Sequence, residues 1–377
     1  MIAFLAFFFS QAYSQQQPET KYKFTTLIEL TNTPVKNQAK SGTCWSYSAN
    51  SFLESEMIRE DKDPVELSQL YTARCVYMEK AINYVRMHGS LNWGDGGELH
   101  DCIDMYAKYG AIPQNIYTGL HYGTTKNNFG EMQAILKGIL DAVIANHNGK
   151  LTTSWYKAFN DVLDEYLGPV PKTFQYEGKK YTPLTFANER VGIDPKKYIE
   201  IGSVTTDPYY EKNFYFSQDN WAFKSVINVQ IGDLTDIIDY ALSHGYTVGW
   251  ATDMSEKYFD GKTLGVAYVP EKEYEDMNDT EKKTIFDGPK PERVITPEMR
   301  QIAFDNYETT DDHGMHIVGL ASDQTGRKYY IVKNSWGDNY GQKGYVYVTK
   351  AYVQYKTTAI LVHEDAVPKD LLKKMKI

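Results

Sequence analysis

Cysteine is scarce in this chain, which limits the part that disulfide bonds can play. Only Cys44, Cys75 and Cys102 occur among 377 residues. Cys75 and Cys102 could pair in an oxidising compartment, which would leave Cys44 as a free thiol. Cys102 lies two positions after His100, but two candidate ligands do not make a metal site. We therefore expect no metal ion and no organic cofactor.

The chain also lacks an excess of basic residues and any long hydrophobic run. Its net charge is −9, and no basic stripe is present, which argues against nucleic acid as the main partner. The apolar segment 2–9 is too short to span a bilayer, so we expect no stable membrane span. Hydrophobic residues make up 42% of the chain and include 31 tyrosines, enough for a sizeable core.

The N-terminus has the pattern of an export signal. The apolar segment 2–9 is followed by Ala12-Tyr13-Ser14, which resembles a small-x-small cleavage site. No Lys or Arg precedes the apolar segment, as expected if the start is clipped. The alternative is a buried N-terminal strand. We predict that residues 1–14 form a signal peptide and that the protein is secreted or periplasmic.

The most informative feature is a set of four polar residues in a fixed order, Gln38, Cys44, His316 and Asn334. A thiol, an imidazole and an amide in this order indicate nucleophilic catalysis by cysteine, if the fold brings them together. Each residue alone has an ordinary structural explanation, such as a small buried thiol or a core histidine. Their order and local contexts favour the catalytic interpretation.

Each of the four residues has a predicted role. Cys44 is the nucleophile, and a helix beginning there would help it to ionise. His316 would accept the thiol proton and return it to the leaving amine. Asn334 would orient the imidazole. The amide of Gln38 and the backbone N–H of Cys44 would stabilise the oxyanion.

The local pattern predicts a helix at Cys44 and strands around the histidine. Apolar residues at helical spacing follow Cys44. The β-prone runs 317–320 and 329–332 predict an antiparallel pair that places His316 beside Asn334. His313 lies nearby, but the Ile-Val context favours His316.

Three of these motifs resemble the papain-like cysteine peptidases. They are Gln38-x5-Cys44-Trp45, His316-Ile317-Val318-Gly319 and Asn334-Ser335-Trp336-Gly337. Within this group the chain is most similar to the bleomycin hydrolase family, also called aminopeptidase C. The further matching segments are Glu66-Leu67-Ser68-Gln69, Asp95-Gly96-Gly97, Lys108-Tyr109-Gly110 with Ile112-Pro113, and Lys343-Gly344-Tyr345.

The resemblance implies an α+β, two-lobed papain-like fold. A helical lobe would carry Cys44, and an antiparallel β lobe would carry His316 and Asn334. The cleft between the lobes would bind peptide substrates, and the family likeness implies a homo-oligomer, specifically a hexamer. The candidate substrate-cleft residues are Trp45, Gly96, Gly97, Met315 and Trp336.

The spacing predicts a large insertion. Cys44 and His316 are 272 positions apart, whereas papain-type enzymes separate the two residues by about 130–150. Apolar stripes at helical spacing in 132–144 and 155–167 favour helices within the surplus segment. The predicted division is a helical lobe over 15–113, a mainly helical insertion over 114–226, a β lobe over 227–368 and a tail over 369–377.

The tail leaves the mode of cleavage open. In the family, the terminal carboxylate of the tail lies in the cleft and caps the substrate amine. Here the tail is expected to be shorter, and it ends Lys373-Lys374-Met375-Lys376-Ile377, which is basic. We predict an aminopeptidase that acts on short peptides. The alternatives are a cathepsin-like endopeptidase and a non-catalytic peptide-binding protein, and the four intact site residues argue against the latter.

Overall fold

The computed structural model describes residues 21–146 and 149–377. The predicted signal peptide, 1–14, lies outside the described residues. None of the helices in the described part of the chain is long and apolar enough to cross a membrane.

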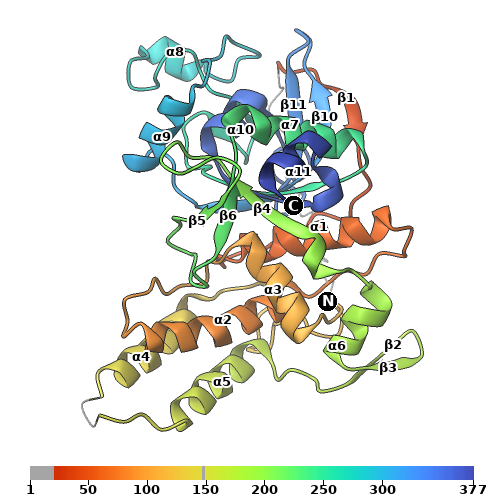
Figure 1. Ribbon diagram of the computed structural model, residues 1–377, viewed down its shortest axis with the longest axis vertical. Helices are drawn as coiled ribbons and strands as arrows, with labels where there is room; N and C mark the ends of the chain where they lie inside the picture. The colour runs from red at the N-terminus through yellow and green to blue at the C-terminus, as the bar shows by residue number, and fades with distance from the viewer. Residues whose placement is uncertain (1–20, 147–148) are drawn as a thin grey trace, which may run out of the picture.

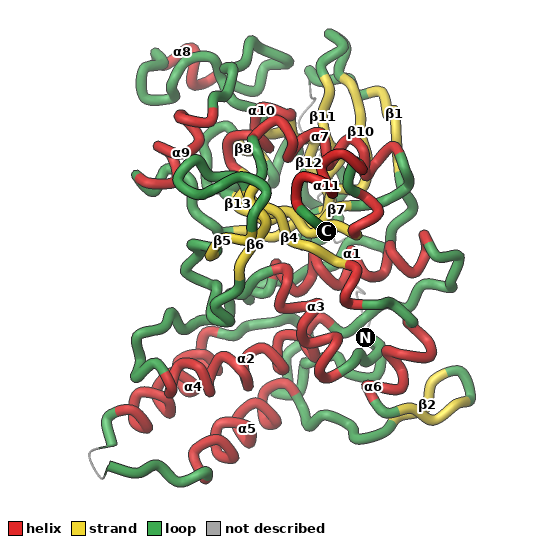
Figure 2. Tube along the Cα trace, in the orientation of Figure 1, coloured by secondary structure: helices red, strands yellow, loops and turns green. Residues whose placement is uncertain are grey.

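The described chain forms two lobes, one built mainly of helices and the other around a large sheet (Figures 1 and 2). The helical lobe occupies the lower half of both views, and the strands of the large sheet gather in the upper half. Its main helices are α1 (Cys44–Arg59), α2 (Gln69–Arg86), α3 (Leu99–Tyr109), α4 (Gly130–Ile144) and α5 (Ser154–Leu167). The fold is therefore α+β, as predicted.

The sheet lobe is mostly antiparallel, and β10 lies near its middle. Strand β10 (His313–Ser322) pairs with β1 (Thr25–Glu29), β7 (Val248–Thr252) and β11 (Lys328–Lys333). The pairing of β10 with β11 confirms the predicted antiparallel pair. The other principal strands are β4 (Tyr198–Gly202), β5 (Lys212–Phe214), β6 (Ser225–Asn228), β12 (Tyr345–Thr349) and β13 (Thr357–His363). Helices α7 (Ile231–Ser243), α9 (Pro297–Asp305) and α10 (Lys350–Lys356) belong to this lobe.

Helix α1 lies between the two lobes. Fourteen of its sixteen residues are buried, so it is covered all round rather than along one stripe. One side packs into the helical lobe, where Trp45 and Phe52 join the hydrophobic core. The other side packs against β10. This central position places the first residue of the helix, Cys44, at the junction of the lobes.

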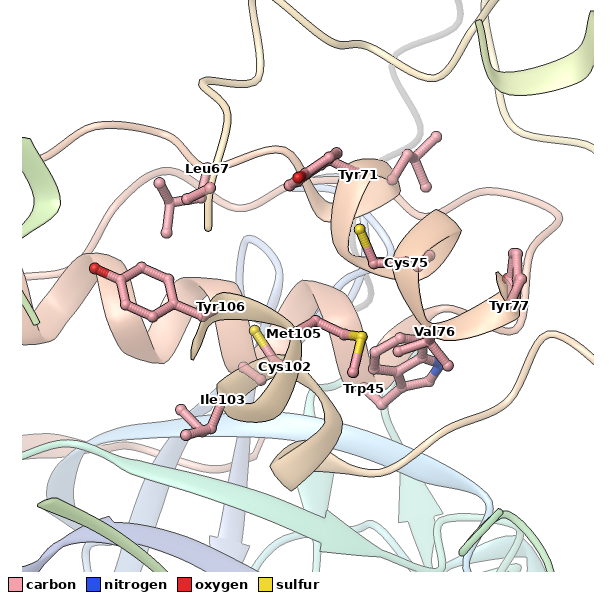
Figure 3. Close-up of a cluster of buried hydrophobic side chains, with 14 of the residues drawn as sticks. Trp45, Leu67, Tyr71, Cys75, Val76, Tyr77, Cys102, Ile103, Met105 and Tyr106 are labelled. Atoms are coloured by element: carbon pink, nitrogen blue, oxygen red, sulfur yellow. The ribbon is translucent and has the colours of Figure 1, made fainter. Parts of the chain in front are cut away.

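The two remaining cysteines lie inside the helical lobe and are not bonded to each other. Cys75 lies on α2 and Cys102 on α3, and both side chains are buried among apolar neighbours that include Met105 and Val76 (Figure 3). Both are free thiols. Their burial makes them part of the packing rather than a cross-link.

The segment 114–226 differs from its prediction as a mainly helical insertion. Helices α4 and α5 are present where the apolar stripes predicted them. A small hairpin follows, formed by β2 (Phe174–Tyr176) and β3 (Lys179–Tyr181). Strands β4, β5 and β6 then join the main sheet, where β4 pairs with β13. The predicted boundary at 226 is therefore wrong for the sheet, because strand pairing crosses it.

Candidate active site

Cys44 is the first residue of α1, as predicted, and only 9% of it is exposed. The loop before it is fixed by Asp95. The carboxylate of Asp95 accepts a hydrogen bond from the backbone N–H of Gly42 at 2.5 Å. The backbone carbonyl of Asp95 accepts one from the indole N–H of Trp45 at 3.0 Å. The thiol therefore lies at the N-terminal end of a helix dipole, which favours negative charge on sulfur.

Asn334 is hydrogen bonded to His313. The distance from His313 Nε2 to Asn334 Oδ1 is 2.8 Å. The same Oδ1 accepts the backbone N–H of Ser335 at 2.8 Å, so it is an acceptor and His313 Nε2 must carry the proton. This tautomer leaves Nδ1 of His313 as the nitrogen that can accept a proton. The ring of Trp336 lies beside His313, with centroids 5.2 Å apart.

The prediction that His316 pairs with Asn334 is wrong. His316 is fully buried, and its Nδ1 lies 3.0 Å from the hydroxyl of Ser51 on α1. Lys333 donates to the same hydroxyl oxygen at 2.9 Å, so the Ser51 O–H donates to the ring. His313 and His316 are three residues apart on one strand, an odd separation that places their rings on opposite faces.

His316 lines a different cavity from that of Cys44. This cavity measures about 20 Å³ and is bordered by Ser51, Lys333 and one side of Asn334. Burial, and then the neighbouring Lys333, lower the pKa of His316 well below its ordinary value. His316 is therefore a neutral core side chain that packs behind the site.

Gln38 is held next to the segment that follows β11 and carries Asn334. Its backbone N–H donates to Ser335 at 2.8 Å, and its side-chain oxygen accepts the Ser335 hydroxyl at 2.5 Å. Nε2 of Gln38 donates one of its two hydrogens to the carbonyl of Ser41 at 2.7 Å. The second hydrogen remains for another acceptor. These bonds fix the amide close to the start of α1.

Burial keeps the thiol and the imidazole neutral. It raises the pKa of Cys44 to about 12, and the nearby carboxylate of Asp311 acts in the same direction. It lowers the pKa of His313 to about 4, although the bond to Asn334 opposes that shift. Neither group ionises easily alone. A direct proton transfer would create adjacent opposite charges, whose attraction offsets the cost of burial.

Cys44 and His313 line one cavity of about 240 Å³. Among the predicted cleft residues, Trp45, Gly96 and Gly97 also line it. Met315 does not, because it is fully buried in the core of the sheet lobe. Trp336 contacts His313 from outside the cavity lining. In the described residues no group of three or more His, Cys, Asp or Glu side chains could hold a metal ion.

Comparison with known families identifies the group to which the chain belongs. The model of the Peptidase C1-like family matches residues 7–377, nearly the whole chain. The chain belongs to this family. It is a cysteine peptidase, and its fold is papain-like.

Curated relatives are distant in sequence but similar over most of their length. Aminopeptidase C of Lactococcus lactis subsp. cremoris is 26% identical over 92% of this chain and 84% of its own. Cysteine proteinase 1, mitochondrial, of Saccharomyces cerevisiae is 24% identical over 95% of this chain and 80% of its own. The crystal structure of PepW from Lactobacillus rhamnosis shares the fold, with a TM-score of 0.71 and 19% identity, covering 93% of this chain and 84% of that one.

The C-terminal tail of this cysteine peptidase lies away from the thiol cavity. Residues Lys369–Met375 form helix α11, which packs on the sheet lobe through Leu371 and Met375 (Figure 1). Lys374 lies 5.0 Å from the centre of the Tyr210 ring. The cavity lining includes no residue from 369–377.

The structure also shows an acidic lining that the sequence analysis missed. Five carboxylate side chains border the cavity of Cys44, namely Asp95, Glu98, Asp219, Asp311 and Asp312. Asp311 and Asp312 directly precede His313, so their position beside the imidazole was the available signal. Asp219 lies far from all the motifs in the sequence, and only the fold brings it to the cavity.

Proposed function

We propose that this cysteine peptidase hydrolyses peptide bonds through Cys44, His313 and Asn334. The observation that carries the proposal is the hydrogen bond between His313 and Asn334, with His313 and Cys44 lining the same cavity. Asn334 stabilises the His313 tautomer that carries its proton on Nε2. Nδ1 of His313 is then free to act as the general base.

Acylation begins when Sγ of Cys44 attacks the carbonyl carbon of the peptide. The thiol proton passes to Nδ1 of His313 as the S–C bond forms. When the C–N bond breaks, the proton moves from His313 to the leaving amine, and a thioester remains. A water molecule then gives a proton to His313 and attacks the thioester. The sulfur leaves and recovers that proton, and the free acid departs.

The negative oxygen of the tetrahedral intermediate needs two donors. The backbone N–H of Cys44 lies at the unpaired start of α1. The second hydrogen on Nε2 of Gln38 is the other candidate donor. Because Gln38 is anchored to Ser335 and Ser41, its amide is oriented before the substrate arrives.

We propose further that the enzyme removes residues from the free N-termini of short peptides. Relatives named Aminopeptidase C, which align over most of their length, support this mode of action. The test compares leucine aminomethylcoumarin, which has a free amine, with its N-acetyl derivative. Preference for the free amine is expected. Equal kcat/KM values would reject aminopeptidase action and favour an endopeptidase.

A second test addresses the nucleophile. An irreversible epoxide inhibitor should add one molecule to Cys44 in the native enzyme and none in the Cys44→Ala variant, as read by mass spectrometry. Labelling of Cys75 or Cys102 instead would contradict the assignment, since both are buried in the helical lobe.

Export and assembly remain predictions from the sequence. N-terminal sequencing of the protein purified from its own cells would show whether residues 1–14 are removed. Sedimentation analysis would show whether six copies assemble.

A further inference from the structure

The cavity beside Cys44 has an unusual charge balance. Its five carboxylates face a lining that contains no Lys or Arg. Of these five carboxylates, only Asp219 has a cationic partner among the described residues, namely Lys80, whose Nζ lies 3.8 Å away. Asp95 and Asp312 are held by backbone N–H groups, from Gly42 and from Met254 at 2.9 Å. The cavity therefore favours a cationic group in any substrate that enters it.

Glu98 is the most buried carboxylate of this wall, and it shares the Ser217 hydroxyl with Asp311. Glu98 is only 1% exposed, and the pair has no ion-pair partner among the side chains described. Ser217 lies 2.5 Å from Oε1 of Glu98 and 3.3 Å from Oδ2 of Asp311. A single hydroxyl hydrogen serves one of these carboxylates at a time. Tyr215 donates to Asp311 at 3.0 Å.

Hydroxyl groups donate to the two carboxyl groups, but no cation offsets their charge within the described residues. Burial, and then repulsion from Asp311, raise the pKa of Glu98 well above its ordinary value. Burial raises the pKa of Asp311 as well. Without a cation the pair holds a proton, whereas an ammonium group between them would replace that proton and offset the cost of burying both charges.

The thiol and the imidazole indicate, independently of the carboxylates, where the substrate carbonyl would lie. The reacting carbonyl must lie at Sγ of Cys44, and the α-nitrogen of the same residue lies only about 2.5 Å from that carbonyl carbon. When the first residue of a peptide supplies the scissile carbonyl, its ammonium therefore enters the acidic cavity. A peptide with Lys or Arg before the scissile bond could bring a side-chain cation to the same region.

We infer that Glu98 and Asp311 bind a cationic group of the substrate beside the scissile bond and select peptides that carry one. This inference rests on the proposed function, because it takes Cys44 as the nucleophile. The shared chemistry is an ammonium or guanidinium group, supplied by the N-terminus or by a basic side chain.

The test uses the full-length enzyme and three coumarin amides: leucine, acetyl-leucine and acetyl-arginine. The variants are Glu98→Gln, Asp311→Asn and their combination, which keep shape and remove charge. We expect KM for a cationic substrate to rise about tenfold to a hundredfold in the double variant, the range for hydrogen bonds to charged groups. The ratio of kcat/KM for cationic over neutral substrate should fall by the same factor.

The two sources of the cation give different patterns. A loss confined to the leucine amide assigns the site to the N-terminal ammonium, and a loss confined to acetyl-arginine assigns it to a side chain. The control variant is Asp104→Asn. The carboxylate of Asp104 lies on the same helix as His100, outside this cavity, and forms an ion pair with Lys224 at 2.7 Å. It should leave all three rates as in the native enzyme.

A measurement on the native enzyme covers the case in which the variants do not fold. Leucine amide should inhibit more strongly than 4-methylpentanamide, which has the same shape without the amine. Equal inhibition by the two, or unchanged KM values in folded variants, would overturn the inference. If the native enzyme prefers free amines and the variants keep that preference, the inference fails and the proposed aminopeptidase stands. If acetyl-arginine is preferred over both leucine substrates and the variants lose that preference, the reverse holds.

Discussion

At the scale of single residues, the site depends on which of two histidines faces the thiol. His313 and His316 both belong to β10, and both are buried. His313 shares a cavity with Cys44 and bonds to Asn334, whereas His316 bonds to Ser51 behind the site. The apolar sequence after His316 gave the wrong indication, because it reports a strand core and not the face that meets the cleft.

Separate substitution of the two histidines gives the most direct test of this assignment. His313→Ala should lower kcat by about 10²–10⁴-fold, since general acid–base catalysis is lost. His316→Gln should keep kcat within a few-fold of the native value, at a cost of about 1–3 kcal/mol in stability from a disturbed buried bond. Steady-state kinetics and thermal unfolding of both variants measure these effects. A greater loss of kcat in the His316 variant would restore the prediction made from the sequence.

At the scale of elements, the proposed mechanism needs β10 to lie close against the start of α1. Gly314 makes this approach possible. A Cβ atom on Gly314 would lie 2.9 Å from Oγ of Ser48 and 3.0 Å from the backbone Cα of Trp45. Any side chain would push the strand that carries His313 away from the helix that carries Cys44.

The substitution Gly314→Val should therefore damage both stability and activity. We expect the free energy of unfolding to fall by about 1–3 kcal/mol because of overpacking. We expect kcat to fall by a larger factor than this loss of stability alone explains, because the thiol and the imidazole separate. Denaturant unfolding and kcat measure the two effects. The matched control is Gly232→Ala in α7, where an added Cβ meets no atom within 4 Å. Native activity in the Val variant would show that the close approach is not needed.

Arg300 joins three elements of the sheet lobe. It lies on α9, is 2% exposed, and donates to the carbonyls of Ser203 at 2.8 Å, Gln354 at 2.8 Å and Thr357 at 2.5 Å. Burial lowers its pKa to about 10, still well above neutral, so the guanidinium remains charged.

Arg300→Met should leave these three carbonyl oxygens without their donor. We expect a loss of about 2–4 kcal/mol in unfolding free energy, measured by denaturant titration. The control is Arg86→Met, since Arg86 is exposed at the end of α2. Equal stability of the two variants would show that the buried guanidinium adds no net stability.

At the scale of the whole molecule, the two lobes must keep their relative position for the cleft between them to exist. His100 on α3 and Glu200 on β4 join them, with Nδ1 and Oε2 2.5 Å apart. Burial disfavours a charged ring, but the attraction of Glu200 and then Asp101 outweighs it and raises the pKa of His100 to about 9. The contact is therefore an ion pair at neutral pH.

This ion pair predicts a pH dependence of stability. A histidine whose pKa rises on folding adds its full share to the free energy of unfolding below its unfolded pKa, about 6.5. That stabilisation is lost as the pH rises through the folded pKa, about 9. Its size is about 3 kcal/mol. The melting temperature of native enzyme should exceed that of His100→Gln by most at pH 6, and the gap should narrow by pH 10. The exposed control, His121→Gln, should show no such trend, and a constant gap for His100→Gln would contradict the ion pair.

The sequence alone was sufficient to predict the α+β class of the fold and to indicate the class of enzyme. Local patterns were sufficient for the helix that begins at Cys44, for helices α4 and α5, and for the pairing of β10 with β11, because periodicity and turns are properties of short segments. Motif order was sufficient to indicate a cysteine peptidase. Only the tertiary structure decided which histidine meets Asn334, because a strand presents alternate residues to opposite faces. The tertiary structure also brings Glu98, Asp219 and Asp311 to the cavity of the thiol. Long-range packing, and not local sequence, places such distant carboxylates together.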